Sequence, residues 1–182
     1  GPKIVEKPVD LMAEISVITA RDKLGQIVCY DPPLNQHSNH ILSRSTVPCA
    51  LDATLQEQAC NMARRLAEAT DLVGVFGLEF FVTHDGDLLA NEVAPRPHNS
   101  GHWSIDACSA SQFEQHVRTV CGLPVAPVWR HSDIVMDNLL GHDSHDLEPY
   151  IQHRGACLHL YGKGEARSGR KMGHVTYLQD RK

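Results

Sequence analysis

The stretch that decides the fold of this chain is residues 74–92, GVFGLEFFVTHDGDLLANE. Its first half is rich in β-branched and aromatic residues, a composition typical of a β-strand. Asp85-Gly86 then favours a tight type I′ turn, because both turn positions need positive φ. The apolar run that starts at Leu88 indicates a return strand. Residues 74–92 therefore predict an antiparallel β-hairpin.

A two-residue turn at Asp85-Gly86 fixes the register of this hairpin. The cross-strand pairs that it predicts are Val82–Leu89, Phe80–Asn91 and Glu79–Glu92. Carboxylates at opposed positions lie roughly 5 Å apart and repel each other, and apolar flanks leave little solvent to relieve them. A hard divalent cation such as Mg²⁺ removes this conflict, since it binds one or two carboxylates together with phosphate oxygens and water. We therefore predict Glu79 and Glu92 as metal ligands; the alternative is a solvated strand end.

A polar loop continues the return strand over residues 93–103, VAPRPHNSGHW. It places a guanidinium, imidazoles and an amide within a few residues of the carboxylate pair. A soluble domain seldom concentrates so many directional polar groups in one loop unless they meet a ligand. The loop therefore predicts a binding or catalytic site.

This pattern of Glu, hairpin and Asn-Glu resembles the metal-binding hairpin of the ATP-grasp superfamily. The loop that follows resembles one of its families in particular, the N5-carboxyaminoimidazole ribonucleotide synthases of purine biosynthesis. The resemblance runs from about Lys3 to Thr176. It implies an α+β fold: the C-terminal half of an ATP-grasp fold, an antiparallel sheet with helices, at residues 1–125, and a small β-rich C-terminal domain at 126–182.

The activity implied by the resemblance is ATP-dependent carboxylation of 5-aminoimidazole ribonucleotide by bicarbonate, through carboxyphosphate. The implied cofactors are ATP and Mg²⁺, with Mn²⁺ as an alternative ion. The implied partners are the ribonucleotide, bicarbonate, a second copy in a homodimer, and the N-terminal domains of the same polypeptide. Because the family's glycine-rich phosphate loop and lysine-bearing strands do not precede Glu6, we expect a C-terminal piece that is inactive alone.

The resemblance also assigns roles to residues. It implies that Arg96, His98 and Asn99 are catalytic and orient bicarbonate, carboxyphosphate or the acceptor amine, with His98 also a candidate proton acceptor. The residues that it assigns to the nucleotide are Glu6, Lys7, Pro8, Val9, Glu14, His37, Asn91 and Glu92. It assigns the ribonucleotide phosphate to Lys163 and Arg170, whose charges suit a dianion. The plain alternatives are a polar strand face at Glu14, an exposed loop at His37 and a solvated basic turn at Arg170.

Composition excludes several classes of function. The net charge is −5 and the basic residues do not cluster, so we expect no nucleic-acid partner. There is no apolar run of the ~20 residues that a membrane helix needs, and no signal peptide, so we expect a cytoplasmic protein. The six cysteines include no C-x-x-C pair, which argues against a zinc knuckle.

Periodicity and turn residues predict the remaining elements. Residues 53–69 form the clearest helix, with an apolar stripe of Leu55, Ala59, Met62, Leu66 and Ala69. A second helix is expected at 110–121, with its stripe at Phe113, Val117 and Val120. We expect further strands near 13–20, 26–30, 46–50, 134–140, 156–161 and 174–178, a polar loop at 31–45, and a linker at 123–127.

Two rival functions stay open at this point. One is another ATP-grasp ligase, such as a formate-dependent transformylase or a relative of biotin carboxylase. The other belongs to a different class: a non-catalytic module for nucleotide binding or dimerisation that has kept the fold.

Overall fold

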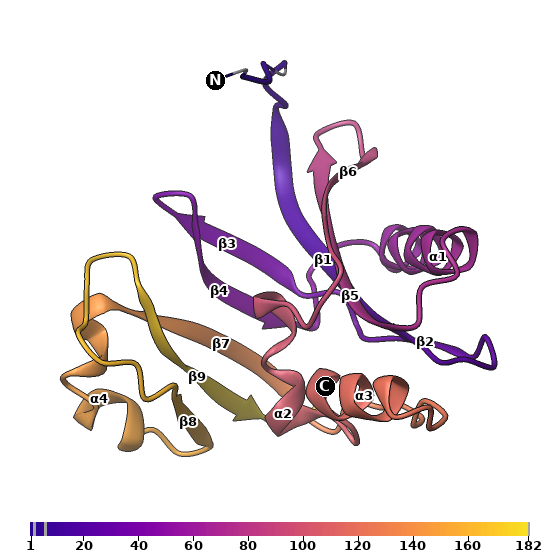
Figure 1. Ribbon diagram of the computed structural model, residues 1–182. Coiled ribbons are helices and arrows are strands. Elements are labelled where there is room, and N and C mark those ends of the chain that lie inside the picture. Colours follow the sequence, from indigo (N-terminus) through magenta and orange to yellow (C-terminus); the bar gives the residue numbers. More distant parts are fainter. Residues whose placement is uncertain (2, 6, 182) are drawn as a thin grey trace.

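The computed structural model describes residues 1–182 apart from 2, 6 and 182. One antiparallel sheet has the strand order β6-β5-β1-β3-β4-β7-β9-β8, and β2 pairs with β1 beside it (Figure 1). The strands are β1 (Leu11–Arg21), β2 (Ile27–Cys29), β3 (Leu34–Ser38), β4 (Ile41–Val47), β5 (Gly74–Thr83), β6 (Leu88–Ala94), β7 (Asp133–Leu140), β8 (Ala156–Leu160) and β9 (Lys171–Gln179). An α+β fold with an antiparallel sheet is thereby confirmed.

The helices are short apart from the first. They are α1 (Ala53–Ala69), α2 (Ser104–Ala107), α3 (Gln112–Val120) and α4 (Glu148–Ile151), with 3₁₀ turns η1 (Asn99–Gly101) and η2 (Gly141–Ser144). The bounds predicted for the first helix are confirmed, and Asp52 caps it by accepting from the backbone N–H of Thr54. None of the described helices is long and apolar enough to cross a membrane.

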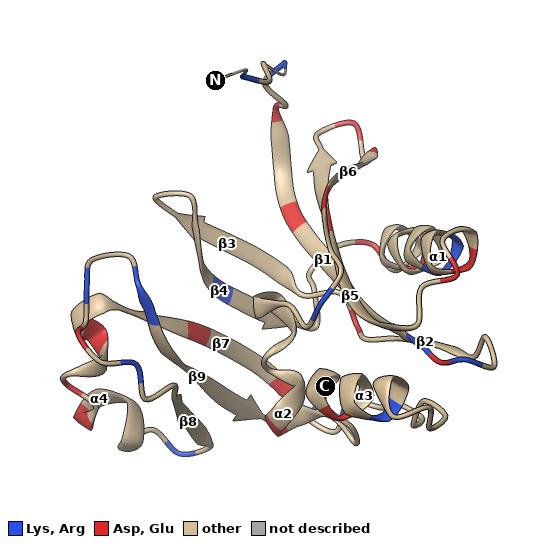
Figure 2. Ribbon diagram, viewed as in Figure 1, with Lys and Arg blue, Asp and Glu red and all other residues tan. Residues whose placement is uncertain are grey.

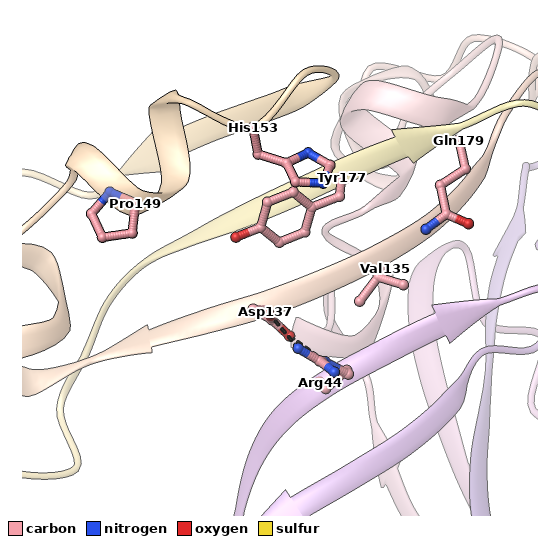
Figure 3. A pocket seen from close by; sticks show the side chains of 7 residues that line it. All are labelled: Arg44, Val135, Asp137, Pro149, His153, Tyr177 and Gln179. Atoms are coloured by element: carbon pink, nitrogen blue, oxygen red, sulfur yellow. Dashed lines mark hydrogen bonds and ion pairs between the residues drawn. The ribbon is translucent and has the colours of Figure 1, made fainter.

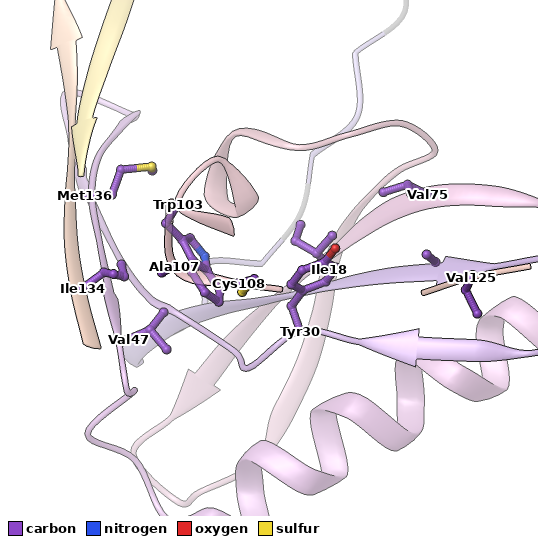
Figure 4. Close-up of a cluster of buried hydrophobic side chains, with 11 residues drawn as sticks. Ile18, Tyr30, Val47, Val75, Trp103, Ala107, Cys108, Val125, Ile134 and Met136 are labelled. Carbon is purple, nitrogen blue, oxygen red and sulfur yellow. The ribbon is translucent and has the colours of Figure 1, made fainter. Parts of the chain in front are cut away.

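Strand alternation divides the sheet into two differently covered faces. Ile15 and Val17 of β1 pack with α1, whose buried residues are Ala59, Ala63 and Ala67. Ile18 and Ala20 face the other way, into a core centred on Trp103, which is fully buried (Figure 4). Tyr30 meets the Trp103 ring edge-on at a centroid distance of 6.3 Å. The loop that follows β6 is therefore anchored by its tryptophan on the face opposite α1.

The predicted hairpin forms, but by a different turn. Thr83 pairs with Asp87 through a backbone bond of 3.0 Å, so the loop has three residues and ends at Gly86 with φ of 83°. The predicted pairs Val82–Leu89 and Phe80–Asn91 are therefore wrong, and Val82 and Phe80 lie opposite Leu88 and Ala90. A β-bulge at Asn91 then shifts the register by one residue and restores the predicted pair Glu79–Glu92.

The polar loop predicted at 31–45 is wrong, because β3 and most of β4 form a hairpin there. Its turn is Asn39-His40, with φ of 49° and 63°, which matches a type I′ turn. Neither Asn-His nor the polar β3 sequence carries the usual hairpin signal. The strand predicted near 46–50 is the end of β4, which stops at Val47.

Helix α3 turns its polar side inward, against the expectation. Its predicted apolar stripe is largely outside, with Val117 58% exposed, while Gln112, Gln115 and Thr119 are fully buried. The Gln115 amide donates to the carbonyl of Ala126 at 2.7 Å and accepts from its N–H at 3.0 Å. Periodicity failed here because the buried amides satisfy the backbone of loops, which lack hydrogen-bond partners of their own.

The sheet continues across the predicted domain boundary at residue 125, because β4 pairs with β7. Residues 123–129 form no helix or strand, as expected of a connection. A bidentate ion pair, Arg44 to Asp137 at 2.6 and 2.7 Å, joins the two strands. The division into residues 1–125 and 126–182 stays a prediction.

The inverted polarity of α3 can be tested by unfolding. Gln115→Ala should lower the free energy of unfolding by about 2 kcal/mol or more, since it leaves two buried backbone groups of Ala126 unpaired. Val117→Ala, on the exposed stripe of the same helix, should cost about 0.5 kcal/mol or less. Urea denaturation followed by circular dichroism measures both. Equal losses in the two variants would contradict the observed orientation.

Candidate functional site

The two predicted metal carboxylates lie on the open face of the sheet. Glu79 of β5 sits between Ser16 of β1 and Glu92 of β6, because β5 pairs with both strands. The bulge at Asn91 brings that amide to the same face, where its side chain hydrogen-bonds to Glu79. Strict alternation would have turned Asn91 away. The bulge therefore adds a third oxygen-bearing side chain to the carboxylate pair.

The surroundings of Glu79 destabilise its charged form. Its side chain is only 17% exposed, whereas Glu92 is exposed. The pKa of Glu79 is raised, first by burial and next by the Glu92 charge, and the partly compensating His37 charge lowers it. A half-buried carboxylate held opposite a second one fits a divalent cation, which would reverse both penalties. Glu79, Glu92 and Asn91 are the residues that would hold Mg²⁺.

The loop after β6 is clamped beside this pair. The Gln112 side chain of α3 accepts from the backbone N–H of His98 at 2.9 Å and donates to its carbonyl at 2.7 Å. Arg96 is exposed, and its guanidinium donates to the carbonyl of Pro97 at 3.0 Å. The Oδ1 atom of Asn99 is buried without a partner among the described residues. Arg96 and Asn99 thus offer a donor fork and an unused acceptor.

The imidazole of His98 connects the loop to the carboxylates. Its Nε2 lies 3.4 Å from Oε1 of Glu79, and its Nδ1 lies 2.9 Å from Oγ of Ser100. Burial lowers the pKa of His98 to about 4, helped by the charges of Arg96 and Lys171. The side chain is therefore a neutral imidazole near pH 7. The three residues predicted as catalytic lie together, next to the predicted metal ligands.

The residues predicted for the nucleotide lie along the neighbouring edge. A cavity of about 480 Å³ is lined by Lys7, Pro8, Val9, Phe81, Leu89, Ala90 and Asn91. On the face of β1 that carries Ser16, Oε2 of Glu14 pairs with Nδ1 of His37 at 2.9 Å, and both charges act on Glu79. His37 reaches this place because it belongs to the hairpin that the sequence did not predict. Glu6 lies outside the described residues.

Lys and Arg residues lie on β9 and on the segment that precedes it, and Asp and Glu residues lie on β1, β5 and β6 (Figure 2). Burial lowers the pKa of Lys171 to about 7, with Lys163 and Arg96 as the next causes, so the three cations lie near one another. Lys163 donates to the carbonyl of Lys171 at 2.8 Å, whereas Arg170 donates to the carbonyl of Glu165 at 2.9 Å. Among the described interactions, none joins Arg170 to the loop after β6. Lys171 was not predicted, although it follows Arg170 directly.

Comparison with known proteins identifies the family of this chain. A family model described as the ATP-grasp domain matches residues 1–113. This chain belongs to the ATP-grasp family. A second model, described as the phosphoribosylaminoimidazole carboxylase C-terminal domain, matches residues 134–182. The ATP-grasp resemblance of the hairpin is thereby confirmed.

The N5-carboxyaminoimidazole ribonucleotide synthase of Brucella melitensis biotype 1 is 52% identical over 181 residues, 100% of this chain and 50% of the relative. A solved ADP complex of an N5-carboxyaminoimidazole ribonucleotide synthetase matches at a TM-score of 0.92 and 43% identity, covering 97% of this chain and 47% of that one. An Aspergillus clavatus N5-carboxyaminoimidazole synthase, solved with ADP and 5-aminoimidazole ribonucleotide, matches at 0.90 and 30% identity, covering 96% and 48%. The chain spans about half the length of the relatives that it matches.

A second polar network of the ATP-grasp chain escaped the sequence analysis. The hydroxyl of Tyr161 lies 2.9 Å from Nδ1 of His102 and 2.7 Å from Nδ1 of His174, joining the loop after β6 to β9. His159 stacks on His174 at 4.5 Å and 11°, and its Nε2 contacts both oxygens of Asp106 at 3.0 Å. Lone pairs of parallel rings do not converge on one ion, so this cluster is a poor metal site. Only long-range pairing brings these residues together, and spacing gives no signal of it.

A separate pocket of about 250 Å³ lies over the C-terminal strands (Figure 3). It contains the Arg44–Asp137 ion pair with His153, Tyr177 and other side chains, and none of the predicted site residues. Tyr177 lies on the face of β9 opposite His174. We do not assign the predicted chemistry to this pocket.

Magnesium binding can be measured on the chain itself. Mg²⁺ at about 100 times its dissociation constant should stabilise the chain by about 2.7 kcal/mol, through binding to the folded state alone. In Glu79→Gln this response should vanish. Without Mg²⁺, Glu79→Gln should be more stable than the unsubstituted chain at pH 7. Folding raises the pKa of Glu79, so the stability that its neutral carboxyl group contributes is lost as the pH rises through the raised pKa.

Thermal unfolding with and without Mg²⁺ gives both quantities. Glu57→Gln, at an exposed position on α1, is the matched control and should change neither. A magnesium response that survives in Glu79→Gln would exclude this carboxylate as a ligand.

Proposed function

We propose that this chain forms the metal site and much of the acceptor site of an ATP-grasp ligase that carboxylates 5-aminoimidazole ribonucleotide with bicarbonate through carboxyphosphate. The observation that carries the proposal is the meeting of three groups on one open face. These are the carboxylates Glu79 and Glu92, the loop Arg96–Asn99, and the cations of the C-terminal strands. The names of the relatives support the same reaction.

The residues suit the first half of this chemistry, phosphoryl transfer from ATP to bicarbonate. Such a transfer needs aligned oxygens and neutralised charge more than covalent help from the protein. Mg²⁺ held by Glu79 and Glu92 would neutralise phosphate oxygens; Mn²⁺ satisfies the same oxygen ligands. The exposed Arg96 guanidinium has the planar donor fork that binds bicarbonate or carboxyphosphate in a bidentate manner. Lys7, Pro8, Val9, Glu14 and His37 would hold the nucleotide at the adjoining edge.

The second half joins the acceptor amine to the carboxyl carbon. The unpartnered Oδ1 of Asn99 is an acceptor of the kind that an amine N–H requires. Water must be kept away from carboxyphosphate because it hydrolyses. The fully buried Trp103 anchors the loop from below and does not line the site, so exclusion of water falls to other parts of the enzyme.

The cation cluster suits the phosphate of the ribonucleotide. Lys163 and Arg170 were predicted for this role, and Lys171 joins them because its half-buried ammonium lies near Lys163 and Arg96. A dianion there would favour the charged form of Lys171 and remove the repulsion that lowers its pKa. We include Lys171 as a phosphate ligand.

Four further parts of the proposal concern the complete enzyme. We propose that the chain acts together with an N-terminal portion of the kind that its relatives carry, since they are about twice as long. We propose that it is inactive without that portion. A cytoplasmic location and a homodimer also stay predictions.

The decisive measurement uses a chimera in which residues 1–182 replace the matching half of the Brucella melitensis relative. ADP release at fixed bicarbonate should require the ribonucleotide. Glu92→Gln in the chimera should abolish turnover and leave the circular dichroism spectrum unchanged. ADP release that ignores the ribonucleotide would favour a different ATP-grasp ligase, and Mg²⁺-dependent ADP binding without turnover would favour a non-catalytic module.

The phosphate site can be separated from the chemistry by kinetics. Arg170→Ala in the same chimera should raise KM for the ribonucleotide about tenfold or more, with a smaller change in kcat, because it removes binding that ground and transition states share. Arg167→Ala is the matched control, since Arg167 is exposed and pairs with Glu165. An unchanged KM in Arg170→Ala would remove Arg170 from the phosphate site.

A further inference from the structure

A line of buried polar side chains runs under the site and ends on His98. It consists of Ser45 on β4, Asn35 on β3, Ser16 on β1 and Ser100 in η1, which are 0%, 6%, 0% and 0% exposed. Buried hydroxyl and amide groups cost free energy unless they are paired, and here each is paired with the next. None of these four residues has a role in the reaction proposed above.

The spacing of the line is that of strong hydrogen bonds throughout. Ser45 Oγ donates to Oδ1 of Asn35 at 2.8 Å, and Nδ2 of Asn35 donates to Oγ of Ser16 at 2.9 Å. Ser16 Oγ donates to Oγ of Ser100 at 2.7 Å, which lies 2.9 Å from Nδ1 of His98. Each hydroxyl has a single proton, so the line has one direction or, with the Asn35 amide turned over, the opposite one.

Contacts at the His98 end decide the direction. The backbone N–H of Ser100 donates to Nδ1 of His98 at 3.4 Å, and a backbone N–H cannot accept. Nδ1 must therefore carry a lone pair, and the hydroxyl proton of Ser100 points toward it. At the other side of the ring, Nε2 lies 3.4 Å from Oε1 of Glu79, too far for a strong hydrogen bond, so this contact does not set the tautomer. A neutral imidazole with a lone pair on Nδ1 carries its proton on Nε2.

We infer that the line Ser45–Asn35–Ser16–Ser100 is a directed hydrogen-bond relay that fixes His98 as the Nε2–H tautomer, so that His98 acts as a hydrogen-bond donor and not as a proton acceptor. Ser16, Asn35, Ser45 and Ser100 are then positioning residues. The catalytic meaning rests on the proposed function, whereas the tautomer itself does not.

With this tautomer, His98 and Asn99 have different roles in the proposed reaction. The lone pair of His98 is occupied by Ser100, so the ring offers the N–H at Nε2, which suits an oxygen of bicarbonate or carboxyphosphate. The proton released when the amine forms its bond to carbon goes instead to the phosphate that leaves carboxyphosphate. Oδ1 of Asn99 accepts a hydrogen bond from the amine without taking its proton.

The test is a ¹⁵N–¹H spectrum of the 182-residue chain labelled at histidine, with the His98 signals assigned by their loss in His98→Gln. We expect a protonated Nε2 and an unprotonated Nδ1 in the parent. A proton on Nδ1, or averaging of the two nitrogens, would overturn the inference. Glu79→Gln should leave the tautomer unchanged; a change there would mean that the carboxylate, and not the relay, sets it.

Ser16→Ala tests the relay itself. Without the Ser16 proton, Oγ of Ser100 is free to accept from Nδ1, so signals of the second tautomer should appear. Ser43→Ala, in which the lost hydroxyl donates to the carbonyl of Gln36 on the same pair of strands, is the matched control and should keep the parent spectrum. An unchanged spectrum in Ser16→Ala would show that the relay does not set the tautomer of His98. If Ser16→Ala does not fold, the parent and Glu79→Gln spectra still decide the tautomer.

Activity gives the functional half of the test. In the chimera, Ser16→Ala should lower kcat about 2- to 10-fold, the effect of one neutral hydrogen bond, with little change in KM. An unchanged kcat would confine the relay to a structural role. Failure of the proposed function would instead appear in the unsubstituted chimera, as ADP release that ignores the ribonucleotide.

Discussion

The pairing of β5 with both β1 and β6 is the constraint on which the rest of the molecule depends. It places Glu79 between Ser16 and Glu92 on one face, and Phe80 with Leu78 under α1 on the other. Helix α1 covers the apolar side of β5, whereas the side of Glu79 is covered in part by the loop after β6 and by α3, which packs on β1 and β5. The cations of the C-terminal strands approach the loop on that same side.

The polar interior of this face explains how the site keeps its shape. Amides and hydroxyls of buried residues bond to loop backbones and to one another, as Gln112 does at His98 and Gln115 does at Ala126. Each such group must be paired to repay its burial, so the network tolerates few alternative arrangements. The loop Arg96–Asn99 is therefore held in place before any ligand arrives, which is the condition for electrostatic stabilisation of developing charge.

The two parts of the sheet carry opposite charges near the site. Acidic side chains lie along β1, β5 and β6, and basic ones along the segment between β8 and β9 (Figure 2). The two parts meet because β4 pairs with β7. The proposed site therefore contains residues from both ranges that match family models, 1–113 and 134–182. A ligand with several phosphates and a carboxylate would bridge cations from one part and a metal ion from the other.

The opposition of Glu79 and Glu92 was predicted from a two-residue turn, but in the structure it depends on the bulge at Asn91. The sequence by itself determined the hairpin, the bounds of α1 and the polar loop with Arg96, His98 and Asn99. These features are local, and short-range rules of turn geometry, alternation and helical period govern them. The tertiary structure decided the bulge that turns Asn91 inward, the β3–β4 hairpin that carries His37, the inward polar side of α3, and the approach of Lys171 and the Ser45–Ser100 line to His98. Those depend on partners far apart in the chain, because a buried amide, bulge or tautomer is set by the groups that pair with it and leaves no pattern in its own segment.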